Sequence, residues 1–110
     1  MLTHRTPLQR QDALAQSAEA RRDRAGLARQ LKTGHLLPTK LFELVYDTTC
    51  EARNMRVSTV LRAMSHVGPV RAEVIRREAG IAGNRRLRGA GRRQRNALLE
   101  LVARVVPRQQ

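Results

Sequence analysis

The sequence predicts an all-α protein in which a long N-terminal helix leads into a compact domain of shorter helices. Three observations carry this prediction. Apolar residues recur at spacings of three and four, prolines and glycines stand where helices begin and end, and no stretch alternates apolar and polar residues as a half-buried strand does. The 110 residues have room for one domain with one modest core.

The first helix is predicted over residues 7–32. Thr6 can cap it, Gln9 completes a capping box, and Gly34 is suited to stop it. Such a helix would be roughly 39 Å long at ~1.5 Å per residue. Its apolar stripe is thin and heaviest near the C-terminal end, so the last turns should pack on the body while the first turns project. We therefore expect a basic helical arm over residues 1–35.

Four shorter helices are expected in the remaining domain, residues 36–110. The predicted segments are a helix over 38–47, a loop over 48–54, a helix over 56–64, a helix from Pro69 to Gly80, and a helix over 92–105. The residues expected to face the core are Leu41, Phe42, Leu44, Val45, Val57, Val60, Leu61, Met64, Val70, Val74, Ile75, Leu98, Leu99, Val102 and Val105. Ile81 should seal the end of the fourth helix.

The charge of the chain is large, positive and unevenly placed. The formal net charge is +13, and 20 of the 22 basic residues are arginine. Residues 1–52 carry eight basic and six acidic groups, whereas residues 53–110 carry 14 arginines and three glutamates. This asymmetry indicates one strongly positive face. The preference for arginine favours forked contacts with phosphate or guanine.

The densest basic stretch is residues 84–95, called the arginine segment below, which holds six arginines in twelve residues around a Gly-x-Gly turn. Its arginines are Arg85, Arg86, Arg88, Arg92, Arg93 and Arg95. Guanidinium groups repel one another and cannot be buried unpaired, so a cluster without an acid is stable mainly against an external polyanion. Gly89 and Gly91 let backbone come close to that polyanion. The segment therefore predicts binding to a nucleic-acid backbone.

A second motif, residues 64–75, resembles the hairpin of helix-hairpin-helix and helix-two-turn-helix proteins. In that pattern, turn amides and the start of the second helix accept a phosphate. Val67 would pin the turn into the core, and Ala72 would let the helices approach closely. The pattern has glycine where this chain has His66, which could donate to phosphate or reshape the turn. A plain αα-hairpin capped by Gly68 is the alternative.

Residues 54–75 and 79–95 together resemble actinobacterial, mycobacterial-type integration host factor, and the similarity extends over residues 54–103. The specific element is Arg-Arg-Leu-Arg-Gly-x-Gly at the right distance from the hairpin. The resemblance implies a nucleoid-associated protein with a helix-two-turn-helix domain like that of a small-subunit ribosomal protein. Such a protein binds and bends duplex DNA with little sequence preference and assists integrase-mediated recombination.

The resemblance also implies which residues touch DNA. Arg85, Arg86 and Arg88 would make the main phosphate or minor-groove contacts. The hairpin contact would come from His66, Gly68, Pro69 and Arg71, although Pro69 stands where the family has lysine. The extra Arg92, Arg93 and Arg95 could compensate for that missing donor. Arg21, Arg22 and Arg24 on the first helix could contact a second DNA segment, or could be an exposed face with local ion pairs.

The expected partners are double-stranded DNA and a phage-type integrase, and a monomer is expected in the free state, with multimers on DNA left open. We expect a cytoplasmic, nucleoid location, since Cys50 is the only cysteine and no apolar run is long enough for a membrane span. Scarcity of aromatic residues favours duplex over single-strand recognition. No cofactor is expected, and the three histidines have no spacing suited to a metal.

Two other functions share this fold. A ribosomal RNA-binding protein is the main alternative, but such proteins usually carry a basic C-terminal tail, and this chain stops soon after its last helix. A repair glycosylase or nuclease fragment is the enzymatic alternative. The sequence shows no catalytic constellation, such as paired carboxylates, so no enzyme is expected.

Overall fold

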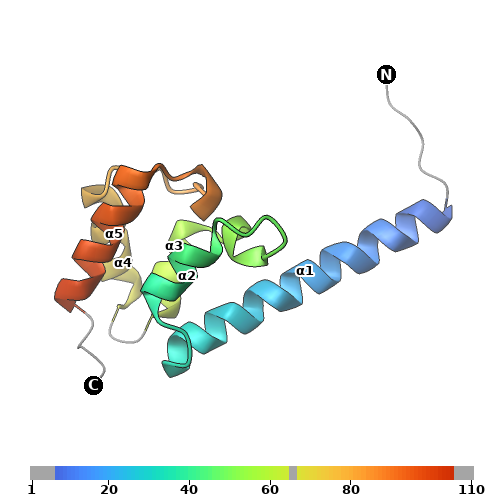
Figure 1. Ribbon diagram of the computed structural model, residues 1–110, viewed down its shortest axis with the longest axis horizontal. Helices are drawn as coiled ribbons and strands as arrows, with labels where there is room; N and C mark the ends of the chain where they lie inside the picture. Colours follow the sequence, from blue (N-terminus) through green and yellow to red (C-terminus); the bar gives the residue numbers. More distant parts are fainter. Residues whose placement is uncertain (1–6, 65–66, 106–110) are drawn as a thin grey trace.

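The computed structural model describes residues 7–64 and 67–105, and the regular elements within them are helical. Figure 1 shows one long helix leading away from a compact cluster of short ones. The elements are α1 (Pro7–Thr33), α2 (Pro38–Leu44), the 3-10 turn η1 (Glu51–Asn54), α3 (Val57–Ala63), α4 (Pro69–Glu78), the 3-10 turn η2 (Leu87–Gly89) and α5 (Arg92–Val105). The all-α prediction is confirmed.

Helix α1 has two different halves. At 27 residues it is roughly 40 Å long, and its N-terminal turns project away from the body (Figure 1). Leu14 in the projecting half is 67% exposed, whereas Leu31 near the other end is 5% exposed and belongs to the core. Gly34 adopts a φ of 82° directly after the helix, the left-handed conformation that glycine takes most readily. The predicted packing and the predicted stop are both confirmed.

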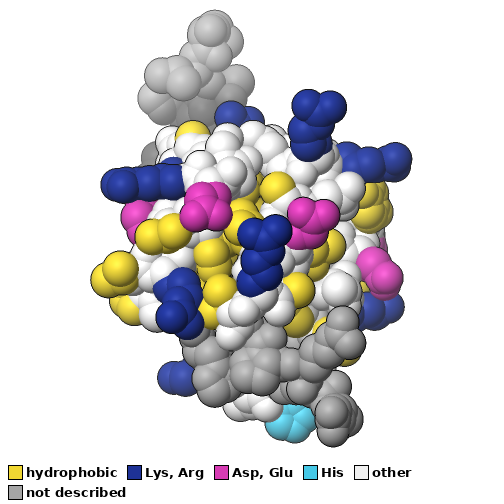
Figure 2. All heavy atoms as spheres, turned by 90° about the vertical axis from the view of Figure 1, so that its left-hand side faces the viewer, with side chains coloured by type: hydrophobic (Ala, Val, Ile, Leu, Met, Phe, Trp, Pro, Cys, Tyr) yellow, Lys and Arg dark blue, Asp and Glu magenta, His cyan; other side chains and the backbone are white. Residues whose placement is uncertain are grey.

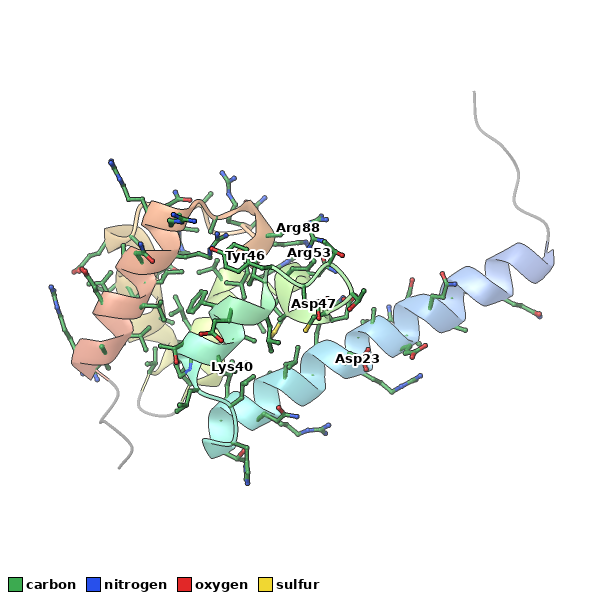
Figure 3. The ribbon with its side chains drawn as sticks, in the orientation of Figure 1. Asp23, Lys40, Tyr46, Asp47, Arg53 and Arg88 are labelled. Atoms are coloured by element: carbon green, nitrogen blue, oxygen red, sulfur yellow. The ribbon has the colours of Figure 1, made fainter. Side chains whose placement is uncertain are left out.

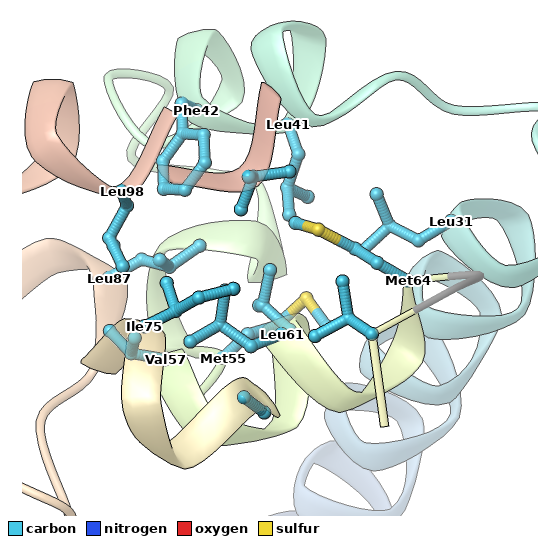
Figure 4. Close-up of a cluster of buried hydrophobic side chains, with 14 of the residues drawn as sticks. Leu31, Leu41, Phe42, Met55, Val57, Leu61, Met64, Ile75, Leu87 and Leu98 are labelled. Carbon is cyan, nitrogen blue, oxygen red and sulfur yellow. The ribbon is translucent and has the colours of Figure 1, made fainter. Parts of the chain in front are cut away.

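The core draws one or more side chains from every short helix (Figure 4). Leu41 of α2, Leu61 of α3, Leu87 of η2 and Leu98 of α5 are all fully buried. Apolar burial of this kind is the main favourable term in folding. Isolated helices this short are only marginally stable in water, so packing on the shared core stabilises them more than their own hydrogen bonds do.

The inward face of α4 differs from the prediction. Val70 and Val74 were expected to be buried, but they are 81% and 48% exposed. The side chains that enter the core are Ala72, Ile75 and Ala79, which follow the three- and four-residue spacing of a helical face. Two apolar stripes therefore run along α4, and the one containing the small Ala72 faces the core, where it permits a close approach to α3.

The connection after α2 also differs from the prediction, because α2 ends at Leu44 and part of the expected loop is the 3-10 turn η1. The Asp47 carboxylate accepts hydrogen bonds from the Thr49 amide and hydroxyl, at 2.9 and 2.6 Å, so the chain turns here instead of continuing the helix. Ala52 within η1 is fully buried. Burial of this small side chain orders a segment that carries no helical sequence pattern.

The remaining boundaries agree with the predictions to within two residues, and the largest difference is at α4, which ends at Glu78 and not at Gly80. Helix α4 is followed by Gly80 with a φ of 72°, and Ile81 behind it is 3% exposed, as expected of a hydrophobic seal. Helix α5 has the predicted bounds. In the described part of the chain, no helix combines the length and the apolar character needed to cross a membrane.

Candidate nucleic-acid interface

A single antiparallel bridge fixes the start of the arginine segment to the core. Arg56 and Arg86 are paired in this bridge. The Val57 amide donates to the Arg85 carbonyl, and the Leu87 amide donates to the Met55 carbonyl, each at 2.9 Å. Since Met55, Val57 and Leu87 are buried, the segment is held by backbone pairing and by apolar packing together.

The arginine segment alternates between buried anchors and exposed charges. Leu87 and Ala90 point into the body, while Arg85, Arg88 and both glycines are exposed. Arg92 and Arg93 are exposed at the start of α5, and Arg86 and Arg95 are half-buried. Arg85, Arg88, Arg92 and Arg93 are therefore exposed along a segment that is anchored to the core by Leu87 and Ala90.

The arginines of this segment make hydrogen bonds to neutral groups. Arg85 donates from Nη1 to the Gly89 carbonyl at 3.1 Å, and Arg86 donates from Nη1 to the Asn54 carbonyl at 2.5 Å. Among the described residues, ion pairs form at Arg24, Lys40, Arg76 and Arg77, none of which lies in the segment. Carbonyl bonds orient a guanidinium without neutralising its charge.

Gly89 has a specific steric role in this arrangement. A Cβ atom at residue 89 would lie 2.9 Å from Cδ of Arg85, closer than such atoms approach one another. The absence of a side chain lets Arg85 fold over the turn and reach the Gly89 carbonyl. Gly91 faces open space, with no atom within 4 Å of the place where its Cβ would be. A backbone or a phosphate could approach there closely.

In the hairpin between α3 and α4, the residues at the start of α4 are exposed to solvent. Gly68 precedes α4 with a φ of −79°, Pro69 is the first helical residue, and both are exposed. Arg71 is exposed on the first turn of α4, and Val67 is 3% exposed, which pins the turn as predicted. His66 lies outside the described residues, so its contact with phosphate stays a prediction.

Three residues near the arginine segment were not predicted as contacts. Arg56 is exposed directly opposite Arg86, and Arg53 on η1 lies close to η2, which carries Arg88 (Figure 3). The Nε atom of Arg53 is buried without a hydrogen-bond partner among the described residues. Tyr46, after α2, touches Arg95. These neighbours come from distant parts of the chain, so no local spacing could have revealed them.

Two arginines outside the segment form hydrogen bonds and ion pairs within the protein. The Arg76 side chain is 13% exposed, donates from Nη1 to the Ile81 carbonyl at 2.5 Å, and pairs with Glu73. The hydrogen bond from Arg76 holds the pKa of the Glu73 carboxyl below its usual range, and the charges of Arg76, Arg77 and Arg62 act in the same direction. Arg24 pairs with Glu51 at 2.7 Å and ties α1 to the body. These two guanidiniums therefore connect parts of the fold: Arg24 connects α1 to η1, and Arg76 connects α4 to the chain after it.

The face formed by α4 and α5 is mixed in character. In Figure 2, hydrophobic side chains gather in its middle, and basic and acidic side chains lie among and around them. Val70 and Val74 are the exposed apolar residues of α4. Because acids are interspersed with the arginines there, this face is less suited to a polyanion than the surface of the arginine segment.

Comparisons with known proteins agree with this geometry. Residues 44–102 match the family described as S13-like H2TH domain. The chain is 45% identical over 97 residues to the integration host factor of Mycobacterium tuberculosis, covering 86% of this chain and 90% of the relative. The integration host factor of Streptomyces coelicolor is 36% identical, covering 81% and 82%.

The chain belongs to the integration host factor family. A solved structure described as "Structure of sIHF bound to an 8bp palindromic DNA" superposes with a TM-score of 0.73 at 31% identity, covering 78% of this chain and 96% of that one. The helix-two-turn-helix resemblance is therefore confirmed, and the ribosomal alternative is not favoured. The family match includes the hairpin and the arginine segment.

Proposed function

We propose that the chain is a nucleoid-associated protein that binds and bends duplex DNA with little sequence specificity. The observation that carries this proposal is the exposed arginine segment. Carbonyl groups orient its Arg85 and Arg86 guanidiniums, and the ion pairs among the described residues lie outside the segment. The membership in the integration host factor family and the similarity to a DNA-bound structure support it.

The proposed mechanism uses two adjacent contacts. The hairpin turn, with Gly68, Pro69, Arg71 and His66, would lie on one phosphate. Arg85, Arg86 and Arg88 would lie on neighbouring phosphates, and a guanidinium could enter a narrowed minor groove, where the potential is most negative. Phosphate contacts position a protein but carry no sequence information directly. This accounts for the low specificity.

The protein would assist a phage-type integrase by bending its DNA substrate, would lie in the nucleoid, and would carry out no enzymatic step. Residues 1–35 would act as an arm, with the exposed Arg21 and Arg22 placed to reach a second DNA segment, which would permit multimers on DNA. Arg24 is less suited to that contact because it pairs with Glu51.

The test is a gel shift with the triple variant Arg85→Asp, Arg86→Asp, Arg88→Asp. We expect loss of binding with the helical circular dichroism retained, since Arg85 and Arg88 are exposed and backbone atoms make the bridge around Arg86. The control variant reverses three exposed basic residues elsewhere, Lys40, Arg77 and Arg104, and so has the same net charge. Equal loss in both variants would mean that net charge, and not this surface, binds DNA.

Three further assays separate the alternatives and test bending. Competition of duplex DNA against ribosomal RNA fragments should favour the DNA, and a preference for the RNA would overturn the proposal. A nicking and base-release assay with the purified protein should show no product. Circular ligation of short DNA fragments reports bending directly, and the protein should increase the yield of small circles.

A further inference from the structure

Tyr46 makes an unexpected contact with the arginine segment. It is the only tyrosine of the chain, lies just beyond the end of α2 and is 65% exposed. The guanidinium carbon of Arg95 lies 5.1 Å from the centre of its ring, within the range of a cation–π contact. The Nη2 atom of Arg95 also donates to the Tyr46 hydroxyl at 3.0 Å.

This contact connects Tyr46 to the arginine segment. Arg95 donates from Nη1 to the Ala90 carbonyl at 2.5 Å, so one guanidinium joins Tyr46 to the backbone of the segment. The pKa of Tyr46 is lowered, chiefly by the hydrogen bond from Arg95 and then by its charge, and Arg92 adds smaller effects of both kinds. Arg95 contacts the exposed hydroxyl directly, and Arg92 lies one helical turn before Arg95 on the same side of α5.

The nearest carboxylate in sequence is engaged elsewhere. Asp47 follows Tyr46, but its Oδ1 accepts hydrogen bonds from the amide and the hydroxyl of Thr49. The Tyr46 oxygen accepts from Arg95, which leaves the hydroxyl hydrogen to donate. A cluster with two cations and a hydroxyl donor, and with no carboxylate paired to Arg95 among the described residues, matches the oxygens of a phosphate group.

We propose that Tyr46, Arg92 and Arg95 form a third anion site, which holds one backbone phosphate of the duplex beyond those held by the hairpin and by Arg85–Arg88. The inference rests on the proposed function and extends its surface to the end of α2. The hydroxyl donates to a phosphate oxygen, while the ring holds the Arg95 guanidinium in place. Because that guanidinium covers one ring face, Tyr46 is unsuited to sandwiching a base.

The first arm of the test compares DNA affinities. Tyr46→Phe keeps the ring beneath Arg95 and removes only the hydroxyl, so the affinity should fall about threefold to tenfold, the usual effect of one hydrogen bond. The slope of log K against log salt should not change, whereas Arg95→Gln should reduce that slope by about one. Thr39→Val, which removes an exposed hydroxyl from α2, is the matched control and should bind like wild type.

The second arm observes Tyr46 itself. Protein labelled with ¹³C at tyrosine Cζ gives one resonance, because there is one tyrosine. Saturating duplex DNA should shift this resonance and raise the pKa of the phenol, since a nearby phosphate disfavours the phenolate. Inorganic phosphate at the same concentration of phosphate groups should shift it less. A larger shift with inorganic phosphate would overturn the assignment to DNA.

The outcomes separate this site from the proposed function. The third site is wrong while the proposed function stands if three results coincide: wild type binds DNA without a shift of its tyrosine resonance, the triple aspartate variant does not bind, and Tyr46→Phe binds like wild type. If wild type fails to bind duplex DNA, both are wrong. Unchanged circular dichroism and unfolding midpoint in Tyr46→Phe ensure that a lower affinity reports the contact and not the fold.

Discussion

At the scale of single residues, the position of an arginine on the fold decides what it does. Arg76 and Arg24 are paired with glutamates and hold elements together. Arg85 and Arg86 are bonded to carbonyl groups and keep their charge for a partner. The composition predicted a positive face, but it could not separate these two classes, because the pairing depends on acids that lie elsewhere in the chain.

The substitution Gly89→Ala tests how Arg85 is held. The new methyl group would lie 2.9 Å from Cδ of Arg85 and would displace that side chain from the Gly89 carbonyl. We expect a loss of DNA affinity of severalfold, because one hydrogen bond orienting Arg85 is worth about 1 kcal/mol. Gly83→Ala is the control, since its methyl group would make only ordinary contacts. Equal affinities for the two variants in a fluorescence-anisotropy titration would contradict this role for Gly89.

At the scale of elements, proline and glycine placement predicted the helices well. Pro38 and Pro69 start α2 and α4, and Gly34 and Gly80 follow α1 and α4 with positive φ. On α4, Ile75 was predicted correctly to face the core, but Val70 and Val74 were predicted wrongly, because the two apolar stripes look alike in sequence and only the packing on α3 distinguishes them. The turn η1 was missed because burial of Ala52 orders it, and that burial is a tertiary effect.

The Glu73–Arg76 pair on α4 predicts a pH effect on stability. The pKa of Glu73 is lowered from its usual 4.5 in the folded protein, mainly by the hydrogen bond from Arg76. The stabilisation is therefore present above the unfolded-state pKa and is lost as the pH falls through the folded-state pKa. Glu73→Gln should lower the unfolding temperature at neutral pH, and its difference from wild type should shrink in acid.

Thermal unfolding followed by circular dichroism from pH 7 to about pH 3 would measure this difference, a range that spans the usual carboxyl pKa values. Glu43→Gln is the control, because Glu43 is 70% exposed and lies 3.5 Å from Lys40. Pairs this exposed contribute little to stability. A Glu73→Gln difference that stays constant down to acid pH would contradict the assigned role of the pair.

At the scale of the whole molecule, the sequence predicted the class of partner better than the shape of the surface that meets it. The density of arginines at residues 84–95 and the hairpin motif indicated a polyanion. The bridge that sets Arg56 opposite Arg86, and the contact of Tyr46 with Arg95, join residues 30 and 49 positions apart. Only the shared core brings such pairs together. The division into an arm and a domain at residue 35 stays a prediction.

The salt dependence of duplex binding tests the central claim most directly. About six arginine–phosphate contacts should release counterions and give a slope near −5 in a plot of log K against log salt. The triple aspartate variant should show weaker binding and a shallower slope, measured by anisotropy on the same duplex. Binding that stays insensitive to salt from about 50 to about 200 mM would contradict an interface built on these guanidiniums.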